Sequence, residues 1–507
     1  MRAVRLWSPA HPLESFASSL AQLLSRENRV QSFSYMCTDV SVSRLLGELQ
    51  RLTSLQQLDV LSPFTGAGGQ GLVVWARELV QLKPLRNLLS LQLHAREIRG
   101  SLPPALFRCL NRLQHLTISA KCRLPAAVVR QLSGLRSLEL HGASMDSAAA
   151  QAASALQQLS RLCISVRACG PVPEPAGDGA AGGASGQRGS GEGSEAGKPA
   201  AAGAMQRWQE HPVWGQLPLL ARLQVLAVGA ELPAGGGECE AEPAVLPYDW
   251  LEGGVPDGIM DCSSLTHLVL PVALTQLPEL VPGQLPRLGS LDLTHSIVEA
   301  LPPSWCCHLQ SLTRLVLNGA ALAGGRLPPE FAALHSLRSL ELRACRLAAL
   351  PACVASLPGL TSLDLGVNRL ADLPDGPYLL RLRHLSLRGN ALHALPPALA
   401  GATQLEALDC GENQGLVLRP ADVDSILAPL PRLRRLVLSR QPAGYGFGPY
   451  ISAATGAAWD TSSVEALMHL ARRLPQLAVE LERTLPPCLP PAEQGGEEGA
   501  EPASAAL

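Results

Sequence analysis

A short leucine pattern recurs at a nearly constant interval along most of the chain, and this spacing constrains the fold more than any other feature. The stretch LTSLDLGVNRLADLP, residues 360–374, has leucine at its first, fourth, sixth, eleventh and fourteenth positions. From Leu268 to Leu408, the leucine that opens each L-x-L pair recurs after 23, 24, 25, 23, 22 and 23 residues. Self-similarity at an interval of about 20 to 29 residues is typical of a solenoid.

The opening leucine of each pair, here called the anchor, can be followed through both halves of the sequence. The anchors are Leu58, Leu91, Leu116, Leu138, Leu162, Leu226, Leu268, Leu291, Leu315, Leu340, Leu363, Leu385, Leu408 and Leu436. A last, degenerate copy with the sequence LPQLAVEL lies around Leu477. We predict one short strand in each repeat.

The leucine spacing has a physical reason. In a strand, side chains alternate between faces, so both leucines of L-x-L point to one side. The leucines seven and ten residues after the anchor, such as Leu370 and Leu373, fold back over the same interior. Each buried leucine contributes roughly 1.5–3 kcal/mol, but one repeat cannot shield its own leucines. We therefore expect stacked, cooperative repeats with caps at both ends.

A ladder of polar side chains is expected beside the strands. The asparagines five residues after an anchor are Asn368, Asn390 and Asn413. An amide there can hydrogen-bond the backbone of adjacent turns, which the tight bend leaves open. Cys345 is an acceptable substitute at the same position. Ser296 and Ala320 do not donate hydrogen bonds as an asparagine does, so the ladder is predicted to be incomplete there.

These residues resemble the leucine-rich-repeat superfamily and its pattern L-x-x-L-x-x-L-x-L-x-x-N-x-L-x-x-L-P-x-x-L. The match is best over residues 285–418 and looser over 52–165. The recurring Leu-Pro pairs are similar to those of intracellular Ras-group-related and disease-resistance-like arrays, and IRGSLPPAL, from Ile98, resembles a form common in plants. The resemblance implies an α/β solenoid: a horseshoe with a parallel concave β-sheet and short helices, 3-10 turns or extended segments on its convex side.

Two intervals are too long for one repeat. Leu162 and Leu226 are 64 residues apart, and Leu226 and Leu268 are 42 apart. Within the first interval, residues 170–204 contain no Leu, Ile, Met or aromatic residue. Such a segment cannot bury enough surface to order itself. One continuous solenoid and two arrays joined by a hinge both remain open at this point.

These observations divide the chain into six parts. We predict an N-terminal cap or irregular first repeat at 1–50, a first repeat block at 51–167, a disordered Gly/Ala-rich loop at 168–204, a second block at 205–440 with an irregular insert at about 233–261, a capping helix and half-repeat at 441–483, and a disordered tail at 484–507. The cap at 1–50 rests on two amphipathic segments, at 13–24 and 42–49.

Composition excludes several classes of function. Apolar residues make up 47% of the 507, and the formal net charge of −2 argues against a nucleic-acid partner, which needs a basic excess. The sequence has no run of about 20 apolar residues, so no membrane insertion is expected. The N-terminus is a poor secretory signal. The 13 cysteines form no C-x-x-C pair. We therefore expect reduced cysteines, no metal site and a cytoplasmic setting.

Catalytic motifs are missing from the sequence. It has no G-x-x-x-x-G-K-[ST], H-E-x-x-H, G-x-S-x-G or protein-kinase signature. His94 and His141 project from separate concave positions, the second near Glu139, and we interpret them as surface residues. The prediction is a protein that is not an enzyme, with no catalytic residues and no cofactor.

The strand positions between and after the paired leucines are expected to line the concave face. The candidate partner-binding residues there are Asp292, Asn318, Glu341, Arg343, Asp364, Ser386, Arg388 and Asp409. They place acidic residues beside arginines, with Arg338, Arg383, Arg434 and Arg435 flanking. One interpretation is a mixed-charge recognition strip for a protein. The other is a solvated sheet face whose charges pair for little gain.

Tryptophans near the long intervals are further candidates. Trp208 and Trp214 follow the glycine-rich segment, and Tyr248 and Trp250 flank Asp249 in the insert. Each pair either grips a partner or covers a broken edge of the solenoid, and burial of aromatics favours the second interpretation.

The leading hypothesis is a scaffold or adaptor, monomeric by itself, that binds a protein partner on its concave face in intracellular signalling or assembly. The alternatives are the recognition module of an immune-type receptor, the substrate-recognition subunit of a ubiquitin ligase, and an axonemal or cytoskeletal component. The last of these would move the expected location from the cytoplasm to the cilium axoneme.

Overall fold

The computed structural model describes most of the repeat region. The described residues are 3–8, 30–37, 43–61, 72–165, 211–229, 255–270, 274, 276–294, 296, 301–320, 327–413, 415–439 and 461–482. Several predictions lie outside them: the amphipathic segment 13–24, the disordered segments 168–204 and 484–507, most of the insert at 233–261, and the roles of Trp208, Tyr248 and Trp250.

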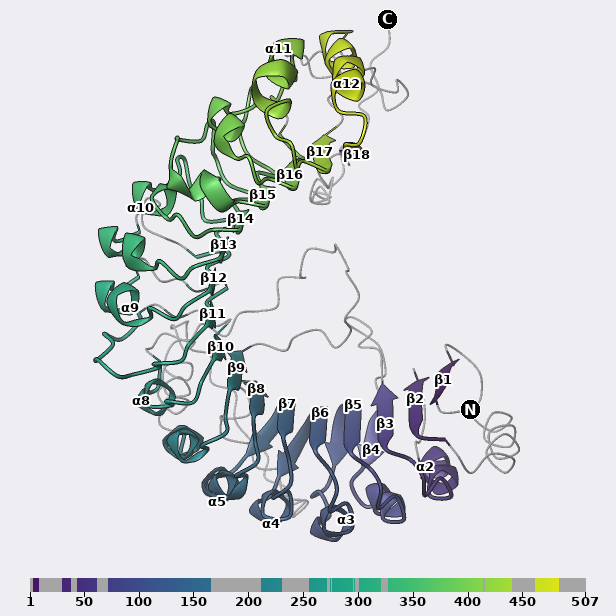
Figure 1. Ribbon diagram of the computed structural model, residues 1–507. Coiled ribbons are helices and arrows are strands. Elements are labelled where there is room, and N and C mark those ends of the chain that lie inside the picture. The colour runs from purple at the N-terminus through teal and green to yellow at the C-terminus, as the bar shows by residue number, and fades with distance from the viewer. Residues whose placement is uncertain are drawn as a thin grey trace, which may run out of the picture.

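The described strands form one parallel sheet of 18 strands that lines the inner face of an arc (Figure 1). They are β1 (Ala3–Ser8), β2 (Ser32–Cys37), β3 (Gln57–Leu61), β4 (Val73–Trp75), β5 (Ser90–Arg99), β6 (His115–Leu124), β7 (Ser137–Met145), β8 (Arg161–Ser165), β9 (Val225–Gly229), β10 (His267–Val269), β11 (Ser290–Asp292), β12 (Arg314–Val316), β13 (Ser339–Glu341), β14 (Ser362–Asp364), β15 (His384–Ser386), β16 (Ala407–Cys410), β17 (Arg435–Ser439) and β18 (Ala478–Glu482).

Short helical segments cover the outer side of the arc (Figure 1). The α-helices are α2 (Ser43–Leu49), α3 (Pro104–Cys109), α4 (Ala126–Val129), α5 (Ser147–Ala152), α7 (Val213–Gln216), α8 (Asp257–Met260), α9 (Pro303–His308), α10 (Ala352–Ala355), α11 (Pro420–Asp422) and α12 (Thr461–Arg473). The 3-10 turns are η1 (Glu78–Leu82), η2 (Ala153–Ala155), η4 (Leu217–Leu219), η6 (Pro329–Ala333), η7 (Pro377–Arg381) and η8 (Pro397–Gly401), and η9 (Val423–Leu427) is a π-helical turn.

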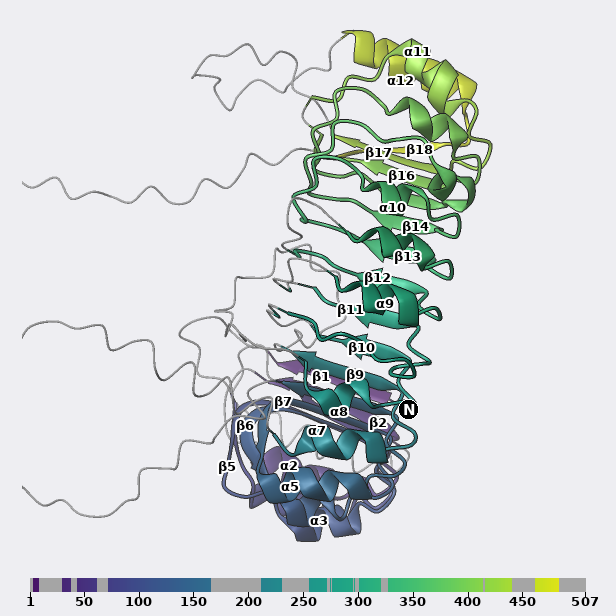
Figure 2. The ribbon, with the colours of Figure 1, turned by 90° about the vertical axis from the view of Figure 1, so that its left-hand side faces the viewer.

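Every anchor is in register with the next one along the sheet. Leu291 pairs with Leu315, and the same register runs from Leu58 to Leu436. The repeats therefore stack one above another along the arc, as Figure 2 shows from the side. The predicted fold class, a leucine-rich-repeat horseshoe with a parallel concave sheet, is confirmed.

The two repeat blocks form one continuous sheet. Leu162 of β8 pairs directly with Leu226 of β9, and Leu226 pairs with Leu268 of β10. The long intervals in the sequence therefore do not interrupt the strand ladder. Of the two arrangements that the sequence left open, this pairing favours the continuous solenoid, because the strands on both sides of the junction are hydrogen-bonded in register.

The sheet also extends beyond the anchors that the sequence shows. Val4 and Phe33 occupy the anchor positions of β1 and β2, before Leu58. At the other end, Val479 rather than Leu477 pairs with the last anchor. These positions were missed because a β-branched or aromatic residue replaces the leucine. The extra strand β4 pairs with the second half of β5, which is ten residues long.

The asparagine ladder binds successive repeats together. Asn368 Nδ2 donates to the carbonyls of Leu342, one repeat earlier, and Leu365, at 2.8 and 2.9 Å, while its Oδ1 accepts from Leu347 N–H at 3.0 Å. Asn390 and Asn413 repeat this arrangement. In the asparagine position of the preceding repeat, the Cys345 thiol donates to Leu317 O at 3.1 Å. These bonds close the turn that follows each concave strand.

The C-terminal end of the arc is covered by α12. Ala466 and Leu470 of this helix are buried. Its polar face reaches η9, where Asp424 accepts from His469 Nε2 at 2.9 Å and pairs with Arg473 Nε at 3.0 Å. The hydrogen bond from His469, followed by the bond from Arg473, holds the pKa of Asp424 below its usual range. The helix thus shields the last leucines from solvent.

Candidate functional site

The sheet places the predicted concave residues in two parallel columns. The first column runs through Asp292, Glu341, Asp364, Ser386 and Asp409, which pair across β11 to β16 with only Val316 between the first two. The second column lies two residues further along the chain, just past the end of each strand, and includes Asn318, Arg343 and Arg388. We call the eight polar residues of these columns the concave strip.

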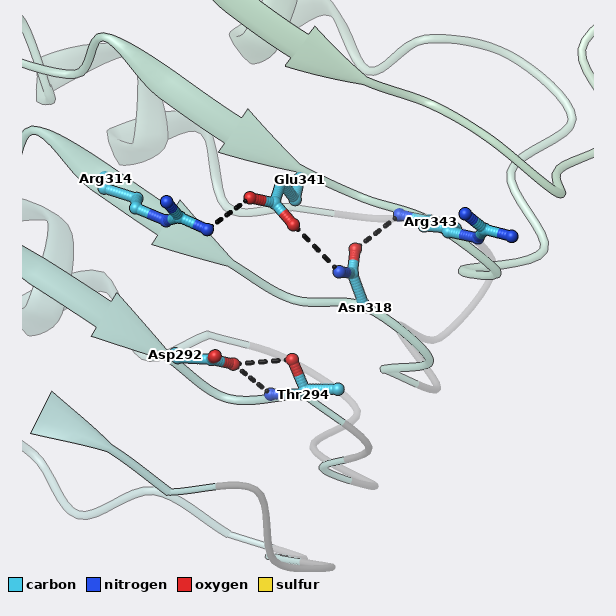
Figure 3. Close-up of polar contacts among 6 residues, drawn as sticks. All are labelled: Asp292, Thr294, Arg314, Asn318, Glu341 and Arg343. Carbon is cyan, nitrogen blue, oxygen red and sulfur yellow. Dashed lines mark hydrogen bonds and ion pairs between the residues drawn. The ribbon is translucent and has the colours of Figure 1, made fainter. Parts of the chain in front are cut away.

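The aspartates of the concave strip hold the backbone that follows them. Asp292 Oδ1 accepts from both the N–H and the hydroxyl of Thr294, at 2.9 and 2.5 Å (Figure 3). Asp364 and Asp409 each accept from the N–H of the glycine two residues on, at 2.8 Å. A short carboxylate that bonds its own backbone in this way stabilises the local turn. One oxygen of each aspartate therefore has a structural role.

Glu341 is the centre of a network across two strands (Figure 3). Its Oε1 accepts from Arg314 Nη2 at 2.8 Å, and its Oε2 accepts from Asn318 Nδ2 at 3.1 Å. Asn318 Oδ1 in turn accepts from the backbone N–H of Arg343 at 2.9 Å. Arg314 was not among the predicted residues, although it lies one residue before its anchor, where alternation on that strand also turns it to the concave side.

The cations of the concave strip differ in their surroundings. Arg388 pairs with Glu412 at 2.8 Å. The guanidinium of Arg343 extends away from the Glu341 network (Figure 3), and no hydrogen bond or ion pair joins it to the described residues. Ser386 is half-buried between Asp364 and Asp409. Arg343 and Ser386 are therefore the members of the strip that are least engaged by the fold.

A second polar cluster lies on the concave face of the first block. His94 is only 5% exposed, and its Nδ1 has no hydrogen-bond partner among the described residues. Burial lowers the pKa of His94, nearby His141 adds to this effect, and Glu139 opposes it. Glu139 itself accepts from Thr117 Oγ1 at 3.3 Å and pairs with Arg161 at 3.3 Å. The prediction of an exposed His94 is wrong, because the side chain is enclosed.

Trp214 is buried, as the favoured interpretation of the sequence expects. Trp214 lies on α7 and is 2% exposed, so it packs in the core beside the long interval instead of presenting a ring to solvent. Trp75, which sequence analysis did not single out, is 41% exposed at the end of β4. The guanidinium groups of Arg77 and Arg99 lie 5.0 and 5.7 Å from its ring centre. That arrangement is a cation–π contact.

The described residues hold no group of three or more His, Cys, Asp or Glu side chains that could bind a metal ion. The cysteines among them are free thiols. Burial raises the pKa of Cys122, Cys262 and Cys306 to about 12, so these thiols are protonated packing groups. Among the helices in the described part of the chain, none is both long enough and apolar enough to cross a bilayer.

Solved structures provide the comparison. A leucine-rich-repeat protein of Leptospira interrogans is 22% identical over 91% of this chain and 91% of that chain, with a TM-score of 0.52. An internalin, InlF, of Listeria monocytogenes is 13% identical over 93% of this chain and 95% of that chain, with a TM-score of 0.37. A Toll–Spätzle complex of Drosophila gives 18% identity over 87% of this chain and 47% of that chain, with a TM-score of 0.47.

Together with the strand register, the Leptospira likeness shows that this chain has the leucine-rich-repeat fold. No protein-family model matches the chain, and no curated protein matches it. The resemblance to intracellular Leu-Pro arrays in particular stays a prediction.

Proposed function

We propose that the chain is a non-catalytic scaffold or adaptor that binds a protein partner on the concave strip. The observation that carries the proposal is the fixed geometry of these side chains. Glu341 is held by Arg314 and Asn318, and the aspartates are held by backbone N–H groups. Side chains that are already immobilised lose little conformational entropy on binding, so a partner gains more from each contact.

The size of the surface fits a protein. Strands about 4.8 Å apart give the strip from β11 to β16 a length of roughly 24 Å. A standard protein interface occupies about 800 Å² per partner, which the strip and its neighbouring columns can supply. Acidic groups in one column lie beside arginines in the other, which favours specificity and fast association over raw affinity.

The setting that we propose is intracellular, in signalling or assembly. Its support is the use of buried thiols as packing and hydrogen-bonding groups, such as Cys345, which donates to Leu317 O and has a pKa raised to about 11 by burial. Oxidation of this thiol would remove a bond between repeats. A reducing compartment keeps it intact.

The test uses the two strip residues that the fold engages least. We expect the intact chain to capture a partner from native extract, identified by mass spectrometry, and the variant Arg343→Glu/Ser386→Arg to lose it. Arg130→Glu/Ser101→Arg, with the same charge changes at exposed positions off the concave strip, should keep it. A partner captured equally by all three proteins would place binding elsewhere.

A further inference from the structure

A second ladder, made of backbone hydrogen bonds, runs along the edge of the sheet where the chain enters each strand, two residues before the anchor. Its consecutive members are Thr313, Arg338, Thr361, Arg383 and Glu406. The N–H of each donates to the carbonyl oxygen of the one before it, at 2.8 Å in every case. The spacing between these side chains is therefore set by the sheet, and Arg338 and Arg383 stand two strands apart, about 10 Å.

A pocket of about 520 Å³ opens between these two arginines. It is lined by Arg338, Thr361, Leu380, Arg381, Arg383 and Gln404. Arg381 ends η7 and is exposed. Three arginines thus line one pocket, and Thr361 lies between Arg338 and Arg383 in the backbone ladder. We call this the arginine pocket.

The arginines of the pocket outnumber the carboxylates that pair with them. Arg338 Nη1 donates to Gly359 O at 2.9 Å. A Cβ at position 359 would lie 2.6 Å from this nitrogen, so the glycine leaves the room that the guanidinium occupies. No carboxylate among the described residues pairs with Arg338 or Arg381, and Arg383 has a long contact of 3.7 Å with Glu406. Three cations against one carboxylate leave an excess of two positive charges.

This charge and geometry fit a dianion with several acceptor oxygens. A phosphate monoester carries about −1.5 to −2 charges at pH 7 and three strong acceptors, and guanidinium forks bind it through paired hydrogen bonds. A phosphodiester carries only about one negative charge and would leave the excess uncompensated. Leu380, which is 61% exposed at the same pocket, offers an apolar contact to the chain that carries the phosphate.

We propose that the arginine pocket binds a phosphate monoester, carried by a phosphorylated side chain of a protein partner. Arg338 and Arg383 grip the phosphate from two sides, Arg381 covers it, and Leu380 contacts the residue beside it. The pocket lies on the strand-entry edge and shares no residue with the concave strip. The proposal therefore stands or fails independently of binding on the strip.

The test is isothermal titration calorimetry on the full chain with three probes. These are inorganic phosphate, a phosphoserine pentapeptide and the same peptide without phosphate, all at matched ionic strength. We expect both phosphate probes to bind and the unphosphorylated peptide to give no binding heat. The variant Arg338→Gln/Arg381→Gln/Arg383→Gln should bind at least tenfold more weakly, and the single variant Arg381→Glu, at an exposed position, should show a loss of the same kind.

A matched control separates the pocket from general charge. Arg86→Gln/Arg108→Gln/Arg130→Gln removes three exposed arginines from the first block and should bind phosphate like the intact chain. Tighter binding of the phosphopeptide than of inorganic phosphate, lost in Leu380→Ser, supports a protein source, whereas equal binding supports a free small phosphate at the same site. The proposal is overturned if phosphate gives no binding heat, or if the control variant weakens binding as much as the pocket variant.

Discussion

At the scale of single residues, the turn after each strand contains unusual backbone conformations. The position four residues after the anchor is left-handed in five successive repeats, and three of these residues are not glycine: Ala344, Val367 and Glu412. Val367 has φ 55° and is 43% exposed. A β-branched residue in this region is strained, at about 1–2 kcal/mol. A backbone hydrogen bond from Val367 N–H to Arg388 O in the next repeat, at 2.7 Å, maintains the conformation.

This strain predicts a stabilising substitution. Val367→Asn should raise the free energy of unfolding by about 0.5–1 kcal/mol, because asparagine tolerates the left-handed region better than valine. Val367→Ala is the matched control: it removes the branched side chain but cannot hydrogen-bond its own backbone as asparagine does, so a smaller gain is expected. Urea denaturation of the three proteins measures the difference. A less stable Val367→Asn would show that the exposed valine side chain contributes packing that outweighs its strain.

His94 predicts how stability depends on pH. Its pKa in the folded protein is below the ordinary value of 6.5, chiefly because the ring is buried. The unfolded chain therefore binds a proton at a higher pH than the folded chain, and the free energy of unfolding falls as pH drops below about 6.5. His94→Gln should reduce the difference in urea midpoint between pH 7.5 and pH 5.5. An unchanged difference would remove His94 as a source of acid sensitivity.

At the scale of one element, the asparagine ladder stabilises the turn that follows the strand. Asn390→Ala leaves Leu370 N–H without its side-chain partner. The carbonyls of Leu365 and Leu387 each lose one of two amide donors and keep the other, from Asn368 and Asn413 respectively. A buried donor that loses its hydrogen-bond partner costs about 1–3 kcal/mol, so we expect a loss of stability in that range by thermal or urea denaturation. Asn111→Ala, at an exposed position, is the control. A loss below 1 kcal/mol at Asn390 would mean that water replaces the amide.

Leucine periodicity predicted the register of every anchored strand, because a two-residue alternation and a constant repeat length leave one way to bury both leucines. It failed for β1 and β2, where Val4 and Phe33 take the anchor position. It also failed to show β4, since this strand belongs to no repeat and only extends the edge of β5.

The candidate site was only partly predictable for a similar reason. Alternation assigns Glu341 and Arg343 to the concave face from the sequence alone. It does not show that Arg314 and Asn318 hold Glu341 from the neighbouring strand, because side-chain geometry chooses among several possible partners. The enclosure of His94 was missed for the same reason: an alternating pattern assigns a face and says nothing of what else lies on that face.

At the scale of the whole molecule, the continuous sheet couples the two repeat blocks through β8 and β9. In stacked repeats, stability passes between nearest neighbours, so damage at the junction should spread both ways. Leu226→Ala removes a fully buried anchor and should cost about 2–5 kcal/mol. Hydrogen exchange should show lower protection in β7 and β8 as well as in β10 and β11.

A second anchor provides the control for this prediction. Leu436→Ala, near the C-terminal end of the arc, should lower protection around β16 to β18 and leave β7 unchanged. If Leu226→Ala affects only the strands that follow it, the blocks behave as separate arrays despite their shared hydrogen bonds.

Partner binding on the concave strip is tested by the dissociation constant of the captured partner for three purified proteins: the intact chain, Arg343→Glu/Ser386→Arg and Arg130→Glu/Ser101→Arg. We predict a constant at least tenfold higher for the first variant and an unchanged constant for the second, with circular dichroism identical in all three. Equal constants for all three proteins would contradict the assignment of the concave strip as the partner-binding surface.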